Sequence, residues 1–273
     1  MEIFFSLLLL SLVLIIVMLF FATFFNVFEQ LFAKIFKKPV YIHFYPFPKN
    51  LTEQQLKILS QEFKFYQRLP ENKKSYFEHR VARFIEKKKF IGKENFVITD
   101  QVKVLIAATS CMLTFGMRHY LYKGLDAIIV YPSIYLSTVS NEYHKGEFNP
   151  RMKVIAFSWE HFVEGFQINN NNLNLGIHEF GHALHFYGLK SEDISALLFA
   201  DMFEKITQQT NHEPNKQLLI QSDYFRVYAY TNQFEFLAVI LEHYFETPNE
   251  FRIEFPELFQ NVSSMLNHKH HNI

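Results

Sequence analysis

The sequence predicts a mostly helical α+β domain with a small sheet, preceded by one N-terminal transmembrane helix. Three observations lead to this prediction. A long apolar run opens the chain, helix-type segments fill most of the rest, and strand-like composition is confined to residues 126–132 and 153–159. Glycine and proline are scarce, at 8 and 9 of 273 residues, which favours helices over a loop-rich fold.

Charge balance and cysteine content exclude several classes of protein. The 27 basic and 27 acidic side chains leave no net charge, so we expect no nucleic-acid partner. A hydrophobic content of 49% excludes wholesale disorder. The single cysteine, Cys111, allows neither an internal disulfide nor a Cys-rich zinc module, and it gives no sign of an oxidising compartment.

The apolar run is predicted to be a membrane anchor, residues 1–28. Residues 3–28 hold no charge, and a helix of these 26 residues is ~39 Å long, against ~30 Å for the hydrocarbon core. The alternatives are a buried core helix and a cleaved signal peptide. A signal peptide needs a basic start and small residues at the cleavage site, whereas bulky Phe24 and Phe25 stand at the exit.

The flanking charges predict the orientation of this single span. Lys34, Lys37 and Lys38 follow the apolar run, and no Lys or Arg precedes it. The positive-inside rule therefore places the body in the cytoplasm. Residues 29–49 form the expected juxtamembrane linker, which is amphipathic at first and then aromatic and rich in proline.

The body is expected to be one domain, residues 50–267, followed by a tail, 268–273. Its first helical region begins with a capping-box pattern, Thr52 and Gln55, and a buried helix opens after Thr99. Strands are predicted at 126–132 and 153–159. The polar segment between them resembles a hairpin connection.

The chemistry-bearing motif is NLGIHEFGHALHFYG, residues 174–188. His178 and His182 are four positions apart, so both imidazoles lie on one face of a helix and suit two ligands of a tetrahedral Zn²⁺ ion. Glu179 lies beside them, within reach of a metal-bound water. Asn174 is expected to cap the helix and Gly188 to end it. Surface histidines would be the alternative, but the apolar neighbours argue against an exposed helix.

A third zinc ligand must come from elsewhere in the chain. Downstream carboxylates, His185, His212 and His243 are candidates. A third ligand from the same helix would crowd the tetrahedron, which favours a second helix within residues 228–248. Glu235 lies in its first turns among apolar residues, where an unligated carboxylate would be costly. Glu242, seven positions further on and on the same face, is the competing carboxylate, with a supporting contact or a structural ion pair as its alternative role.

These segments resemble the Mlc titration factor A family of zinc peptidases and, more distantly, the catalytic domain of anthrax lethal factor. The resemblance covers about residues 51–266 and rests on HEFGHALH, on TNQFEFLAVILEHYFETP followed by FPELFQ, and on VIAFSW. It implies a zincin-like fold in which His178, His182 and Glu235 bind zinc and Glu179 is the general base. It also implies that Tyr228 stabilises the oxyanion.

Two features complicate that assignment. The nearby Tyr230 and a purely packing role are the alternatives for Tyr228. His185 also occupies a position that is usually acidic in the family.

The expected function is a membrane-anchored, gluzincin-like zinc metallopeptidase that hydrolyses peptide bonds through a zinc-activated water. The VIAFSW strand would be the edge to which a peptide or protein substrate adds. The alternative is a membrane-tethered protein that sequesters a transcriptional regulator and keeps a structural or vestigial zinc site. A structural site would need no Glu179 and would have a fourth protein ligand.

Overall fold

The computed structural model describes residues 2–137, 141–168 and 170–268, and the chain divides into two compact units, residues 1–41 and 42–273. The first unit contains helix α1 (Glu2–Phe36). Its segment Ile3–Phe36 has a window of mean hydropathy 3.2, none of it buried, and is long and apolar enough to cross a membrane. A signal sequence near the N-terminus passes the same test.

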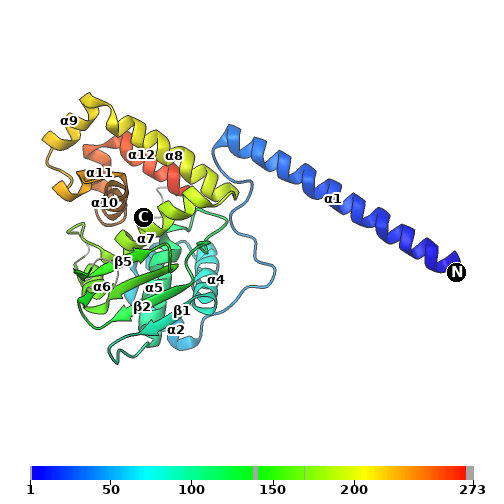
Figure 1. Ribbon diagram of the computed structural model, residues 1–273, viewed down its shortest axis with the longest axis horizontal. Helices are drawn as coiled ribbons and strands as arrows, with labels where there is room; N and C mark the ends of the chain where they lie inside the picture. The colour runs from blue at the N-terminus through cyan, green and yellow to red at the C-terminus, as the bar shows by residue number, and fades with distance from the viewer. Residues whose placement is uncertain (1, 138–140, 169, 269–273) are drawn as a thin grey trace. The chain divides into compact units, whose positions relative to one another are not determined.

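The second unit, the body, is an α+β domain with a small mixed sheet, as the sequence predicted (Figure 1). Its first helices are α2 (Glu53–Glu62), α3 (Lys64–Arg68), α4 (Glu71–Lys87), α5 (Asp100–Leu113) and α6 (Trp159–Gln167). The later ones are α7 (Leu175–Lys190), α8 (Ile194–Asn211), α9 (Glu213–Gln221), the 3₁₀ helix η1 (Val227–Tyr230), α10 (Gln233–Glu246), α11 (Pro248–Glu254) and α12 (Pro256–Leu266).

The main sheet has the strand order β1-β2-β6-β5, formed by β1 (Lys89–Gly92), β2 (Ala127–Tyr131), β6 (Val154–Ser158) and β5 (Gly146–Asn149). Strand β6 is parallel to β2 and antiparallel to β5. The two strands recognised in the sequence are therefore not joined as a hairpin. The connection returns along the sheet and itself contains β5 and a small hairpin of β3 (Tyr135–Leu136) and β4 (Tyr143–His144).

The edge-strand prediction was also wrong. Strand β6, which carries VIAFS, is hydrogen-bonded on both sides, and β5 is the strand at that edge of the sheet. A short strand of sequence GEFN, which begins with glycine and has no alternating pattern of buried residues, gave no strand signal.

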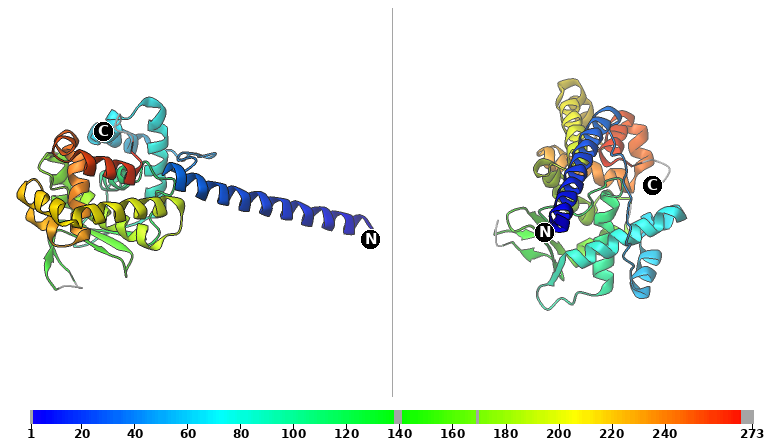
Figure 2. Two further views of the ribbon diagram at one scale, coloured as in Figure 1. Left: turned by 90° about the horizontal axis from the view of Figure 1, so that it is seen from above. Right: turned by 90° about the vertical axis from the view of Figure 1, so that its right-hand side faces the viewer.

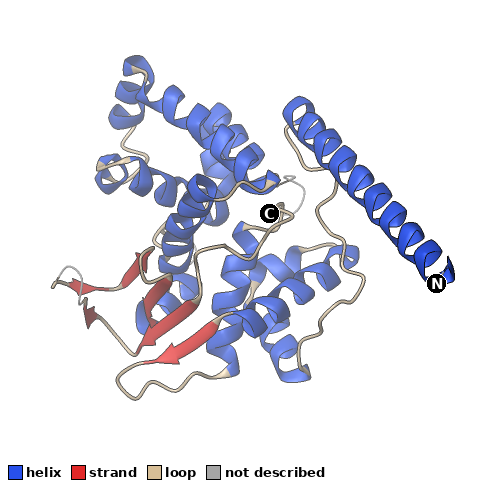
Figure 3. Ribbon diagram, turned by 45° about the vertical axis from the view of Figure 1, so that its right-hand side comes forward, coloured by secondary structure: helices blue, strands red, loops and turns tan. Residues whose placement is uncertain are grey.

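Helix α7 lies at the centre of the body (Figure 1). It contacts β5, β6, α5 and α6, and also α8 and α10. The helices from α8 to α12, yellow to red in Figure 2, gather beside it, and the strands are confined to one part of the body (Figure 3). An element with neighbours on all sides buries its apolar residues, which accounts for the apolar character of the motif helix.

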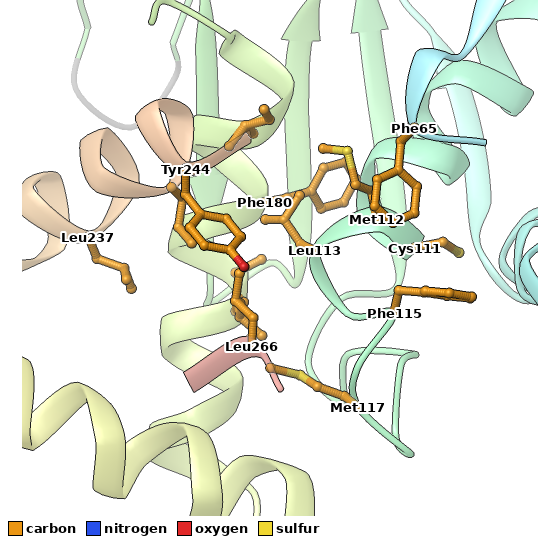
Figure 4. Packing of buried hydrophobic residues seen from close by; sticks show 14 of the residues in the cluster. Phe65, Cys111, Met112, Leu113, Phe115, Met117, Phe180, Leu237, Tyr244 and Leu266 are labelled. Atoms are coloured by element: carbon orange, nitrogen blue, oxygen red, sulfur yellow. The ribbon is translucent and has the colours of Figure 1, made fainter. Parts of the chain in front are cut away.

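The core joins α7 to its neighbours. Phe180 of α7 packs in one cluster with Met112 and Leu113 of α5 and with Leu237 and Tyr244 of α10 (Figure 4). Phe180, Leu113, Leu237 and Tyr244 are fully buried, and the predicted burial of the helix after Thr99 is confirmed. This packing holds the motif helix in a fixed relation to α10.

Local sequence signals set most of the predicted helix starts. Thr52 and Gln55 form the complete capping box of α2, and the Thr99 side chain accepts a hydrogen bond from the N–H of Val102. The prediction for Gly188 was wrong, because α7 continues to Lys190. A Cβ at Gly188 would lie 2.6 Å from Phe199 Cδ1, so this glycine allows α8 to pack closely rather than ending the helix.

The compact unit begins at Ile42, upstream of the expected boundary at residue 50. The ring of Tyr45 stacks on His79 at 4.1 Å, and its hydroxyl accepts a 2.6 Å hydrogen bond from Arg80 Nε. Arg80 is fully buried and also donates to main-chain carbonyls. Residues 42–49 therefore complete the burial of this arginine. The predicted tail lies outside the described residues beyond His268.

Candidate metal centre

Helix α7 presents the two motif histidines on one face. The Asn174 side chain accepts a hydrogen bond from the N–H of Ile177, which fixes the helix start one residue before Leu175, as predicted. The ring centroids of His178 and His182 lie 4.8 Å apart, with the ring planes at 89°. The one-turn spacing along the helix therefore places both imidazoles next to each other on the same face of α7.

Helix α10 brings Glu235 to these histidines. Asn232 caps α10 by accepting hydrogen bonds from the N–H groups of Phe234 and Glu235, so Glu235 lies in the first turn. Its Oε2 atom is 3.1 Å from His178 Nε2 and 3.6 Å from His182 Nε2. One candidate ligand atom from each of the three residues lies within 4.8 Å of the others.

These three side chains fit a metal ion. Ligand atoms at ~2.0–2.1 Å from a tetrahedral zinc ion are ~3.3 Å apart, close to the two distances to Glu235 Oε2. That oxygen is buried and accepts no hydrogen bond among the described residues, although two imidazole nitrogens lie beside it. Burial lowers the pKa of His178, but contacts with Glu235 and Glu242 outweigh burial and raise it to about 10. These carboxylates therefore favour a positive charge on His178, whereas burial and the neighbouring His178 lower the pKa of His182 to about 4.

The other candidate ligands lie away from this centre. His185 is buried between the rings of Phe203 and Phe234, at 4.5 Å from each. His212 is at the start of α9, and His243 packs against Tyr224 and Phe225. Among the residues that the structure describes, the group able to hold a metal ion consists of His178, His182 and Glu235.

Glu179 lies beside the centre and is held by strand β5. It is 6% exposed, and burial raises the pKa of its carboxyl to about 7. A carboxyl with this pKa can both accept and release a proton near neutral pH. Gly146 makes room for it, because a Cβ at that position would lie 2.8 Å from the Glu179 Cγ and Oε1 atoms and 2.6 Å from Leu175 Cδ1.

Gly146→Ala tests whether this strand positions Glu179. The added methyl group must displace the carboxylate, and a displacement of ~1 Å at a catalytic group costs ~100-fold in rate. For the peptide hydrolysis expected from the sequence, the rate should fall by about that factor, with bound metal and melting temperature close to those of the parent chain. Unchanged hydrolysis would show that the absence of a Cβ at position 146 is not required to position Glu179.

Tyr228 lies next to the centre on η1. Its ring centroid is 6.1 Å from that of His178, and half of the residue is exposed. Burial of the rest and the nearby Glu235 raise the pKa of its hydroxyl to about 12, so this group stays a hydrogen-bond donor. The alternative, Tyr230, donates a 2.8 Å hydrogen bond to the carbonyl of Leu219 and serves the fold.

Arg226 and Glu242 meet behind His178. Glu242 is 1% exposed, and its Oε2 forms a 2.6 Å ion pair with Arg226 Nη1. Both side chains, together with Gly146, His178 and Glu179, line a cleft of about 300 Å³. Sequence reasoning recognised Glu242 but missed Arg226. The sequence signal that could have identified Arg226 is its position two residues before Tyr228.

Comparison with known proteins identifies the family of the chain. The model of a family described as glucose-regulated metallopeptidase M90 matches residues 45–266. An uncharacterized protein of Synechocystis sp. is 26% identical over 252 residues, covering 81% of this chain and 89% of the relative. The match spans most of the chain and includes every residue of the centre. The chain therefore belongs to the glucose-regulated metallopeptidase M90 family, the Mlc titration factor A family that its motifs predicted.

Proposed function

We propose that this chain is a membrane-anchored zinc metallopeptidase of the gluzincin type, with a zincin-like body that faces the cytoplasm. The convergence of His178, His182 and Glu235 within 4.8 Å, beside the buried Glu179, carries the proposal. Three protein ligands leave a fourth position open, which is the pattern of catalytic rather than structural zinc sites. Family membership supports a metallopeptidase-type function.

Each residue of the centre has its own proposed role in hydrolysis. When bound by His178, His182 and Glu235, zinc supplies a Lewis acid that polarises a carbonyl and acidifies a water molecule. Glu179 accepts the proton of the attacking water and delivers it to the nitrogen of the leaving amine. The Tyr228 hydroxyl donates a hydrogen bond to the oxygen on which negative charge develops.

Strand β5 offers the substrate a place beside these groups. It pairs with β6 on one side and is the outer strand of the described sheet at that edge, where an extended peptide can add as a further strand. Gly146, its first residue, contacts Glu179 and lines the cleft. A peptide added along β5 would thus pass the general base, which makes β5 rather than β6 the proposed substrate strand.

A cleavage assay with zinc analysis tests this function. The full chain, purified in detergent, is expected to hold one zinc ion and to cleave members of a broad peptide library, with loss of cleavage when a chelator removes the metal. Zinc-loaded protein that cleaves no peptide would instead support the second candidate, a membrane-tethered protein that sequesters a transcriptional regulator.

The anchor is tested separately. Residues 3–28 are uncharged and Lys34, Lys37 and Lys38 follow, so the protein should stay in membranes after a carbonate wash. Its C-terminus should be protected from external protease in intact cells. Release of a mature body from the membrane would contradict the anchor and identify the segment as a signal sequence. Deletion of residues 1–38 should leave a soluble body, because the compact unit begins at residue 42.

A further inference from the structure

Two side chains of opposite charge face the same nitrogen of His178. Its Nε2 atom points to Glu235, and its Nδ1 atom lies 3.5 Å from Glu242 Oε1 and 3.4 Å from Arg226 Nη2. The nitrogen turned away from the metal-binding group therefore has both a hydrogen-bond acceptor and a hydrogen-bond donor beside it. The His178 and Glu242 side chains are only 12% and 2% exposed, so water has little access to either.

These two neighbours favour different protonation patterns of the ring. When His178 binds a metal ion through Nε2, its remaining proton must be on Nδ1. Glu242 can accept a hydrogen bond from that proton. A guanidinium can only donate, so a hydrogen bond from Arg226 requires Nδ1 without a proton and leaves the proton on Nε2, where it blocks the metal.

The same carboxylate also engages the competing guanidinium. Arg226 Nη1 lies 2.6 Å from Glu242 Oε2 and donates a 2.6 Å hydrogen bond to the main-chain oxygen of Asn172. One oxygen of Glu242 thus faces the histidine and the other holds the arginine. Loss of the Glu242 charge would weaken the acceptor for Nδ1–H and at the same time release a donor aimed at that nitrogen.

We propose that Glu242 is a positioning residue that sets the tautomer of His178 against Arg226 and so keeps Nε2 available to the metal ion. The inference rests on the proposed function, because it takes His178 as a metal ligand. It assigns unequal effects on zinc binding to the two members of one ion pair, whereas a purely structural pair would lose stability alike from either side.

The expected changes in zinc affinity follow from these roles. Glu242→Gln should weaken zinc binding by ~10–100-fold, the usual cost of removing a carboxylate partner from a metal-binding histidine. Arg226→Met keeps an unbranched apolar stem and removes the donor, so it should change the affinity by less than ~10-fold. The double variant should bind zinc more tightly than Glu242→Gln alone, since the released donor is gone.

Zinc titration against a chelator of known affinity distinguishes these outcomes, using the full chain in detergent. Glu246→Gln is the matched control, because Glu246 lies one turn further along α10 and contacts Asn174 instead of His178. It should leave zinc affinity unchanged. Circular dichroism checks folding, and Arg226→Leu, which also lacks a donor, replaces Arg226→Met if the latter does not fold.

Two results would overturn the inference. One is a loss of zinc affinity in Arg226→Met as large as in Glu242→Gln, and the other is a double variant no better than Glu242→Gln. Parent protein that binds no zinc would instead refute the proposed function. Failure of the positioning role is thus distinguishable from failure of the metal centre.

Discussion

Glu179→Gln is expected to lower peptide hydrolysis by about two orders of magnitude or more, while zinc and fold are retained. The substitution keeps the shape of a side chain that is 6% exposed and removes the carboxylate that we propose as the acceptor of the proton from water. Tyr228→Phe should cost less, ~10–100-fold, because it removes one hydrogen bond to the developing charge. Initial rates on a cleaved library peptide, with zinc content measured on the same samples, give both values.

The control for this comparison is Glu160→Gln. Glu160 is an exposed carboxylate in the first turn of α6, and its loss should leave hydrolysis unchanged. Equal cleavage by Glu179→Gln and the parent chain would exclude Glu179 as the general base. A larger loss from Tyr228→Phe than from Glu179→Gln would reverse the roles assigned to the two residues.

His182→Ala is expected to abolish stoichiometric zinc binding, because it leaves two ligands where a catalytic site needs three. His185→Ala is the matched control on the same helix, one turn further on. His185 packs between Phe203 and Phe234, so its loss should lower the melting temperature and leave the zinc content unchanged. Metal analysis and thermal melting of both variants separate ligation from packing.

Glu235→Ala completes the ligand assignment. It should remove most of the zinc, whereas Glu242→Gln weakens binding without removing a ligand. Full zinc occupancy in His182→Ala would show that the metal, if present, is bound elsewhere. A greater loss of zinc from Glu242→Gln than from Glu235→Ala would mean that the third ligand was assigned to the wrong turn of α10.

Much of this protein could be predicted from the sequence because the relevant physics acts within a few residues. The spacing of His178 and His182 places both on one helical face. Asn174 caps the start of that helix by accepting a hydrogen bond from Ile177, three positions further along the chain. The same holds for the capping box at Thr52. Each of these features depends on residues close together in the chain, so no contact with a distant segment is needed to predict it.

The errors arose where distant segments compete for the same space. Gly188 has the composition of a helix end, yet α7 continues through it because Phe199 of α8 occupies the space that a Cβ would need. The composition of the VIAFS strand is compatible with both an edge strand and a central strand. Only its pairing with both β2 and β5 decides between them.

The sequence by itself determined the helix, the histidine pair and the position of Glu179 beside them. Tertiary structure decided what surrounds them: β5 beside Glu179, and Arg226 with Glu242 behind His178. The physical reason is that contacts between elements depend on how the core packs. Phe180 of α7 shares one cluster with Leu237 and Tyr244 of α10, and that packing determines which turn of α10 meets the histidines.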